Sequence, residues 1–191
     1  MLRARESDRN DDGDTLELDV LRLFEAFPET SLRLALNLVT SPNPAARRVG
    51  LWSLSVIDFG GRTHFGMVAD AASDPYPEVR ADVMLTLGTI FGAGNPSRAQ
   101  VILIVGTRDP AAAVRRAAVA ALHASRGQVA TNALVASTND SDRQVRHHAA
   151  WSLAGNPAPE ARSALKRLST DEDADVRDVA RRVLALPTRS L

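Results

Sequence analysis

The chain contains no cysteine among its 191 residues, so disulfides, thiolate metal ligands and a cysteine nucleophile are all excluded. Lysine is almost absent as well. Apart from Lys166, all of the 23 basic side chains are arginines, whose guanidinium groups suit bidentate contacts with carboxylates or phosphates. No apolar run reaches the roughly 18 residues that a membrane span needs, and residues 1–14 lack the apolar stretch of a signal peptide. We therefore expect a cytoplasmic protein with no membrane contact.

The formal net charge of zero conceals an uneven distribution. Residues 1–20 carry 7 acidic and 3 basic side chains, which leaves 16 acidic and 20 basic ones for the rest of the chain. We expect residues 1–13 to be a disordered acidic tail. Within this region the stretch Asp8–Asp19, DRNDDGDTLELD, matches the pattern of a calcium-binding loop. Thr15 stands where such loops carry an apolar residue, so an acidic leader before a helix is the interpretation we favour.

A repeat dominates the remainder of the sequence. Similar blocks begin at Ser41 (SPNPAARRVGLWSL), Asp74 (DPYPEVRADVMLTL), Asp109 (DPAAAVRRAAVAAL), Asp140 (DSDRQVRHHAAWSL) and Asp171 (DEDADVRDVARRVL). The spacings are 33, 35, 31 and 31 residues, and an arginine always stands six residues after the block begins. Such self-similarity is the signature of a solenoid or another repeat array.

Each block predicts one helical hairpin. Its opening residues form turns and N-caps, and small or apolar residues then recur at helical spacing. A break rich in glycine, asparagine or proline follows, and then a second helix. We predict an all-α, right-handed α-solenoid over residues 14–191. It comprises a capping hairpin at 14–40 that is split at Pro28, repeats at 41–73, 74–108, 109–139 and 140–170, and a C-terminal half-repeat at 171–191.

The pattern D-P-x-x-x-V-R-x-x-A-A-x-A-L resembles the HEAT-repeat family, particularly the short variety first noted in phycobilin lyases. The resemblance covers residues 41–191. It implies a hydrogen-bonded ladder through the turns, formed by the aspartate and arginine of successive repeats. The ladder residues are then Asp74, Arg80, Asp109, Arg115, Asp140, Arg146, Asp171 and Arg177. Since Ser41 replaces the aspartate, we expect a weaker first rung.

Nothing in the sequence nominates an active site. The four histidines show no metal-ligand spacing, and there is no G-x-S-x-G motif or glycine-rich phosphate loop. We expect no catalytic residues, no metal and no cofactor. A bilin-lyase-like chaperone or enzyme remains a third hypothesis because of the repeat type, although a shared fold is a weak reason to assign a function.

The second helices of such solenoids line the concave face, which is the expected site for a partner. Helical spacing places these side chains on it: Arg33, Arg62, Val101, Ile104, Arg108, Gln128, Asn132, Val135 and Lys166. Its centre is apolar and amide-bearing, and its ends are basic, which suits a protein segment better than a phosphate backbone. The alternative is that Val101, Ile104 and Val135 pack under neighbouring helices.

The first helices offer a second patch, on the convex face. It comprises Arg48, Trp52, Leu85, His147 and Trp151. Side chains four residues apart meet on a helix, so Arg48 can contact Trp52 and His147 can stack on Trp151. Local support of the helix is the interpretation we favour for these pairs.

These features predict a non-catalytic module that binds a protein partner. It would act as an adaptor, a regulator or a stoichiometric inhibitor, such as the immunity protein that binds a bacterial toxin. Pre-ordered helices lose little entropy on binding, which suits this role. We expect a monomer. The alternative, from another class, is nucleic-acid binding in an arginine-lined groove, against which the modest positive charge of the body counts.

Overall fold

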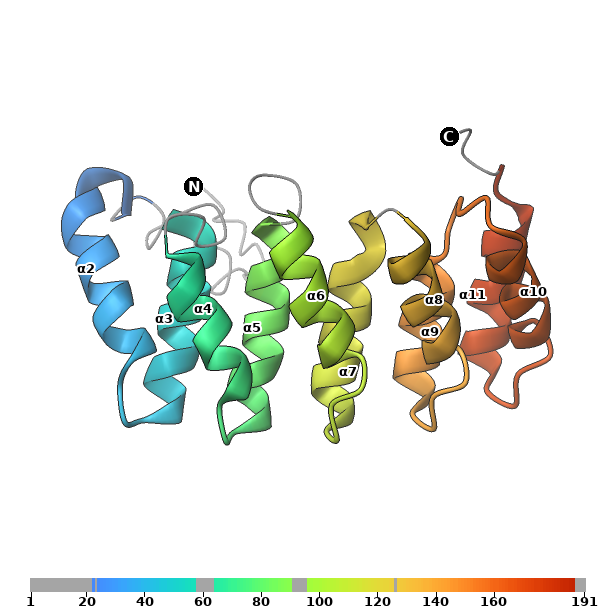
Figure 1. Ribbon diagram of the computed structural model, residues 1–191, viewed down its shortest axis with the longest axis horizontal. Helices are drawn as coiled ribbons and strands as arrows, with labels where there is room; N and C mark the ends of the chain where they lie inside the picture. The colour runs from blue at the N-terminus through green and yellow to red at the C-terminus, as the bar shows by residue number, and fades with distance from the viewer. Residues whose placement is uncertain (1–21, 23, 58–63, 91–95, 126, 188–191) are drawn as a thin grey trace, which may run out of the picture.

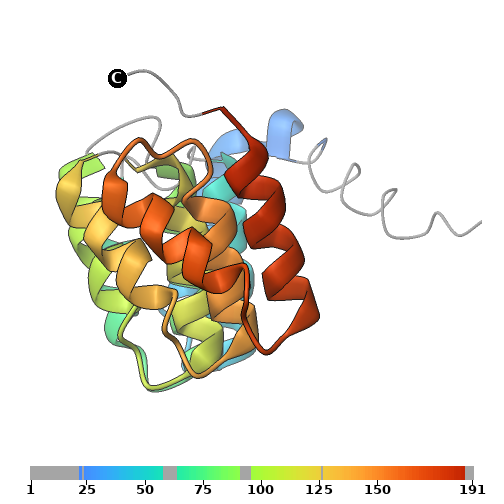
Figure 2. The ribbon, with the colours of Figure 1, turned by 90° about the vertical axis from the view of Figure 1, so that its right-hand side faces the viewer.

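The computed structural model describes residues 22, 24–57, 64–90, 96–125 and 127–187, and all of its regular secondary structure there is helical. The helices form an elongated stack of antiparallel hairpins in two layers. Figure 1 looks onto one layer with the long axis of the stack horizontal, and Figure 2 views the stack from its C-terminal end. The predicted α-solenoid is therefore confirmed.

The first helix of each repeat contributes to one layer, and the second helix to the other. The first helices are α3 (Pro44–Ile57), α5 (Pro77–Ile90), α7 (Ala112–Ala121), α9 (Arg143–Ser152) and α11 (Ala174–Ala185). The second helices are α4 (Phe65–Asp70), α6 (Pro96–Gly106), α8 (Gln128–Ser137) and α10 (Pro159–Leu168), and short 3-10 helices follow α4 at Ala71–Ser73 and α7 at Leu122–Ala124. At the N-terminal end α2 (Pro28–Val39) packs against α3. We call the outward surfaces of the two layers the first-helix face and the second-helix face.

The opening aspartate of a repeat folds the turn and does not cap the helix. Asp109 Oδ1 accepts a hydrogen bond from the Ala111 backbone N–H at 2.8 Å. In the turn before α9, Asp140 Oδ1 accepts in the same way from the Asp142 backbone N–H. The N-cap of α9 is Asp142 itself, which accepts from the backbone N–H groups of Gln144 and Val145. The opening residues of this block thus provide both a turn and an N-cap, the turn through Asp140 and the cap through Asp142.

Apolar side chains at helical spacing form one continuous core between the layers and between repeats. In α7 and the turn after it Val114, Ala118 and Leu122 have no solvent exposure, and the equivalent residues of α9 are equally buried. Small residues let successive first helices approach closely, so each first helix packs on the next along the stack. The layers are therefore rigidly spaced, and their outward faces are fixed relative to each other.

The contact between α2 and α3 depends on a glycine. A Cβ atom at Gly50 would lie 2.6 Å from the Val39 backbone nitrogen and 2.9 Å from the Ala35 carbonyl oxygen. Only glycine, which has no Cβ atom, allows the two helix backbones to approach so closely at this position.

Part of the predicted N-terminal region lies outside the described residues. Helix α2 begins at Pro28, where the split in the capping hairpin was predicted. Several predicted features lie outside the described residues. They are the acidic tail, the possible calcium loop Asp8–Asp19, most of the predicted helix before Pro28, and Arg62.

Candidate functional site

The turns at one edge of the solenoid are joined by a ladder of arginines, each of which pairs with the following repeat. The Nε and Nη2 groups of each arginine donate to both carboxylate oxygens of the next opening aspartate, at 2.7 to 3.0 Å. The pairs are Arg47 with Asp74, Arg80 with Asp109, Arg115 with Asp140, and Arg146 with Asp171. Nη1 of the same arginine donates to two carbonyl oxygens in the opening turn of its own repeat. Each arginine thus joins two repeats.

This direction of pairing corrects the prediction for the first rung. Ser41 does not weaken it, because Arg47 reaches forward to Asp74 and the missing aspartate would only have served an earlier arginine. Arg47, which was not among the predicted ladder residues, is therefore part of the ladder. At the other end Arg177 holds its own turn through Asp171 O and Glu172 O, and no carboxylate of the described residues bridges it.

The ladder fixes the ionisation of its members. Hydrogen bonds from the Arg80 guanidinium hold the pKa of the Asp109 carboxyl below its ordinary value, against the opposing effect of burial. The same contact raises the pKa of Arg80. Both groups therefore stay charged at neutral pH. Their role is to hold repeats together, since each polar atom of the rung is already partnered.

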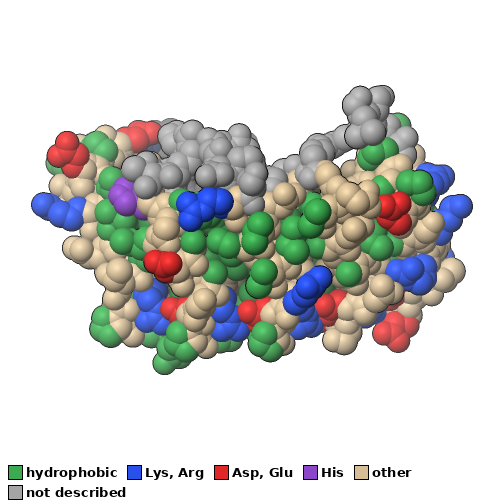
Figure 3. Space-filling model, in the orientation of Figure 1, with side chains coloured by type: hydrophobic (Ala, Val, Ile, Leu, Met, Phe, Trp, Pro, Cys, Tyr) green, Lys and Arg blue, Asp and Glu red, His purple; other side chains and the backbone are tan. Residues whose placement is uncertain are grey.

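The second-helix face carries the most exposed aliphatic side chains of the described residues. Val101 and Val105 of α6 are 62% and 66% exposed, and Val129 at the start of α8 is 66% exposed. Figure 3 views this face and shows hydrophobic side chains gathered across its middle with basic side chains among them, and charged side chains along the lower edge and toward both ends. An aliphatic centre with a charged periphery is the composition of a protein-binding surface.

The predicted residues of this face divide into two groups. Six of them are exposed on α2, α6, α8, α10 or the turn after α6, namely Arg33, Val101, Arg108, Gln128, Asn132 and Lys166. Ile104 and Val135 are instead half-buried against the core, in line with the alternative that they pack beneath neighbouring helices. The prediction missed Val105 and Val129, which directly follow the predicted residues Ile104 and Gln128 in the sequence. A prediction that included both neighbours of each predicted residue would contain them.

Polar side chains border the valines on the C-terminal side. The Gln128 side-chain amide donates to Asn132 Oδ1 at 2.9 Å and also to the Glu160 carboxylate on α10. This contact spans two repeats, so the polar border has a defined geometry and presents a mixture of amide and carboxylate groups.

The first-helix face does not form the two predicted stacks. Arg48 turns away from Trp52 and pairs with Asp82 of the next repeat at 2.6 Å. The Trp52 ring packs near Phe24 instead, with ring centroids 6.2 Å apart. His147 meets His148 edge-on at 5.6 Å, and Trp151 remains exposed. A hollow of about 520 Å³ lies beside Trp52 and is lined partly by the exposed side chains of Val49 and Leu85.

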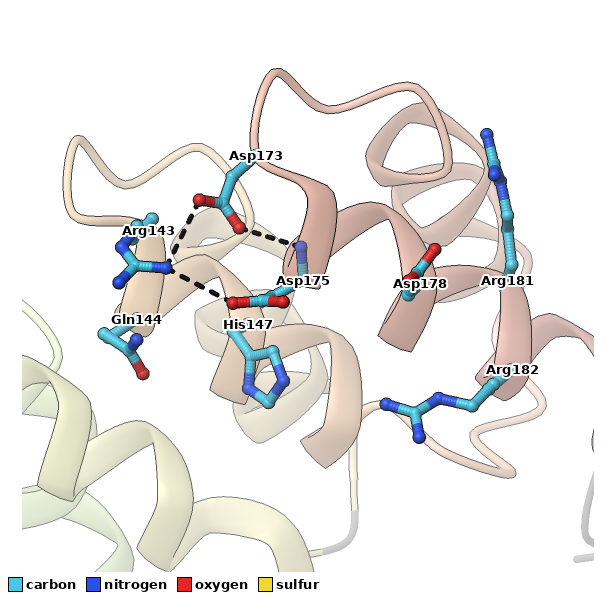
Figure 4. A pocket seen from close by; sticks show the side chains of 8 residues that line it. All are labelled: Arg143, Gln144, His147, Asp173, Asp175, Asp178, Arg181 and Arg182. Atoms are coloured by element: carbon cyan, nitrogen blue, oxygen red, sulfur yellow. Dashed lines mark hydrogen bonds and ion pairs between the residues drawn. The ribbon is translucent and has the colours of Figure 1, made fainter.

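A second hollow on this face, of about 600 Å³, is lined by residues of α9 and α11 and of the turn before α11 (Figure 4). Its lining includes both signs of charge, and Arg143 bridges to Asp173 and Asp175 across it. His147 lies at its margin, and its Nδ1 atom has no hydrogen-bond partner among the described residues. Burial lowers the pKa of the adjacent His148, with His147 and Arg116 adding to the shift. The internal ion pairs leave this hollow without a dominant charge for a ligand.

The described residues contain no cluster of three or more histidine, aspartate or glutamate side chains that could hold a metal ion. Within the same ranges no helix is both long enough and apolar enough to cross a membrane.

The two-layered stack and its ladder of turns define the class, an α-solenoid built from short helical hairpins. The sequence matches the family of HEAT repeats over residues 32–123 and again over 102–185. Because these matches span most of the chain, the protein belongs to the HEAT-repeat family. Among curated proteins, none matches its sequence.

Several solved structures share this fold at low sequence identity. Escherichia coli YibA has a TM-score of 0.75 at 16% identity, with 96% of this chain and 77% of that chain covered. The phycocyanin lyase complex of CpcE and CpcF from Nostoc sp. PCC7120 has a TM-score of 0.62 at 22% identity, over 82% and 99% of the two chains. A designed armadillo repeat protein in complex with the peptide (KR)4 has a TM-score of 0.57 at 16% identity, over 92% and 94%. At these identities the likeness concerns the fold alone.

Proposed function

We propose that the protein is a non-catalytic module that binds a protein partner on its second-helix face. The observation that carries the proposal is the set of three exposed valines, Val101, Val105 and Val129, on the outward side of α6 and α8. Covering a largely exposed valine contributes roughly 1 kcal/mol of binding free energy, since about 25 cal/mol is gained per square ångström of apolar surface removed from water. The set could therefore anchor a partner segment.

The surroundings of the valines indicate the chemistry of that segment. Gln128, Asn132 and Glu160 offer amide and carboxylate groups on one side, and the exposed Arg108 lies just beyond α6. A segment with aliphatic side chains at its centre and polar groups at its flanks matches this arrangement. The rigid layers support the proposal further, because a surface ordered before binding loses little conformational entropy. An adaptor, a regulator and a stoichiometric inhibitor would all use such a surface.

Two solved structures of similar fold show that such a solenoid can serve different functions. The designed armadillo repeat protein holds a peptide, whereas CpcE and CpcF form a lyase. We assign this chain to the first kind because its exposed valines offer an anchor for a peptide.

A quantitative capture experiment tests the proposal. The intact protein, a Val101→Asp/Val105→Asp/Val129→Asp variant and a Val49→Asp/Leu85→Asp variant would be used in parallel on an extract of the source cells. The second variant places the same charge on exposed residues of the first-helix face and so serves as the matched control. We expect one partner to be lost only with the valine variant, while circular dichroism shows that both variants remain folded.

Two other results would contradict the proposal. Loss of the partner with the Val49/Leu85 variant alone would transfer binding to the first-helix face. Salt-sensitive retention of the protein on a DNA column, abolished by Arg33→Ala and Arg108→Ala, would instead favour nucleic-acid binding.

A further inference from the structure

Within the described residues, the arginine ladder ends at Arg177, at the C-terminal side of the stack. Arg177 is held as the other ladder arginines are: its Nη1 donates to Asp171 O at 2.7 Å and to Glu172 O at 2.9 Å. The corresponding bonds of Arg146 measure 3.0 and 3.2 Å. The Nε and Nη2 groups of Arg177, however, meet no carboxylate within the part of the chain that is described.

The same edge of the guanidinium binds a carboxylate in all four complete rungs. There the Nε and Nη2 donors engage both oxygens of an aspartate at 2.7 to 3.0 Å. Because the carbonyl contacts hold Arg177 in place, its unused donors are oriented before any ligand arrives. We infer that the C-terminal end of the solenoid is a carboxylate-binding site that docks an acidic segment of a partner protein, with an aspartate bound by Arg177.

A neighbouring residue defines the partner more narrowly. The position occupied by Leu51, Met84, Val119 and Ala150 in the earlier first helices is buried in each of them. In α11 this position is Arg181, which is exposed, and Figure 4 shows its side chain extending away from α9 while Arg182 turns back toward it. An apolar helix packed here would bury the Arg181 charge without a partner, which is unfavourable. A segment with a second carboxylate would pair with it.

The described N-terminal end of a second copy does not supply this ligand. The opposite end of the ladder has Ser41 in place of the opening aspartate, and α2 packs over α3 at that end. Head-to-tail stacking would therefore bring no free opening aspartate to Arg177. The two cations Arg177 and Arg181, four residues apart on α11, favour a segment of another protein that brings a carboxylate to each of them.

Nuclear magnetic resonance of the arginine Nε–Hε groups tests the inference on the intact protein. The probe is the peptide Ac-DPEEE-amide, and the neutral peptide Ac-NPQQQ-amide is its matched control. We expect a saturable shift of the Arg177 and Arg181 signals with the acidic peptide only. The signals of the four bridged arginines should stay unchanged, since their donors are already engaged.

The second measurement is the peptide affinity of a variant in which lysine replaces Arg177, so that the positive charge is kept and the guanidinium group is lost. Arg177→Lys should weaken the binding of the acidic peptide by about tenfold, since an ammonium group cannot engage both carboxylate oxygens. Arg116→Lys, on the exposed side of α7, should leave the affinity unchanged.

Three results would overturn the inference. One is an unmoved Arg177 signal at millimolar peptide concentration, and another is an equal shift of all exposed arginines, which would indicate general charge attraction. The third is a concentration-dependent dimer, seen by sedimentation and lost in Arg177→Lys, which would make a second copy the occupant.

Discussion

The turn edge and the second-helix face of this solenoid show opposite degrees of regularity. At the turn edge, four successive rungs repeat one arrangement of donors and acceptors with almost the same distances. On the second-helix face, the position eight residues before each block is Arg33, Gly66, Val101, Asn132 and Ser163 in turn.

This difference in regularity indicates that the turn edge and the second-helix face have different roles. Every polar atom of a rung has a partner within the molecule, so a change there is expected to weaken the fold. The outward residues of the second helices make few contacts, so their identity is free to serve recognition. This assignment gives measurable differences in the free energy of unfolding and in its dependence on pH.

The largest effect is expected at a central rung. Arg115→Ala removes the bridge to Asp140 and leaves that carboxylate and two turn carbonyls without their donor. We expect the free energy of unfolding to fall by about 3 kcal/mol, because a mostly buried charge loses its partner. Urea unfolding at pH 7 measures it. Arg116→Ala, the next residue and an exposed one, is the control; similar losses in both variants would contradict a structural ladder.

A pair of glycine substitutions compares packing inside the scaffold with packing on the open face. Gly50→Ala should cost about 2 kcal/mol, since its Cβ would meet the backbone of α2 at 2.6 Å. Gly66→Ala has nothing within 4 Å and should instead stabilise α4, by about 0.5 kcal/mol at most. Thermal unfolding of both variants decides the matter, and a loss of stability in Gly66→Ala would show that the second-helix face is less open than described.

The ladder should also make stability depend on pH. Because the pKa of Asp109 is lower in the folded protein than its ordinary value, this carboxyl contributes stability above a pH of about 4, and the contribution is lost as the pH falls through the folded pKa. In Asp109→Asn the difference in unfolding free energy between pH 7 and pH 3 should be smaller than in the original protein. Asp178→Asn, an exposed residue outside the ladder, should leave that difference almost unchanged. Equal pH profiles for all three proteins would show that the rung does not contribute.

The smallest effect on stability is expected at the exposed valines. Val101→Asp and Val129→Asp, made separately, should each change the free energy of unfolding by no more than about 0.5 kcal/mol, since these side chains are largely exposed to solvent already. Chemical denaturation measures the change. A loss as large as that of Arg115→Ala would mean that the valines belong to the core and not to a recognition surface.

The fold was predictable because its signals are local and repeated. The spacing of the blocks, the break at Pro28 and the small buried residues of α7 all follow from periodicity within a few residues of sequence. The direction of the ladder was not predictable from spacing alone. An arginine six residues after an aspartate could pair within its repeat or with the next one, and only the stacking of the helices determines which.

The candidate surfaces were harder to predict because they depend on neighbours distant in sequence. Arg48 pairs with Asp82, 34 residues later, so helical spacing within α3 could not exclude a contact with Trp52. Similarly, Ile104 and Val135 are half-buried because they pack against the core. Val105 and Val129 lie one residue after Ile104 and Gln128, the residues that the ideal helical angle selects.

The forward reach of each ladder arginine also bears on how a protein of this kind can change its size. A rung requires only an opening aspartate in the following unit, whichever unit that is. Excision of residues 109–139 would place Asp140 opposite Arg80, with the same donors and acceptors as the original pair. Gene duplication or deletion in whole units can therefore lengthen or shorten the second-helix face while the connections at the turns remain intact.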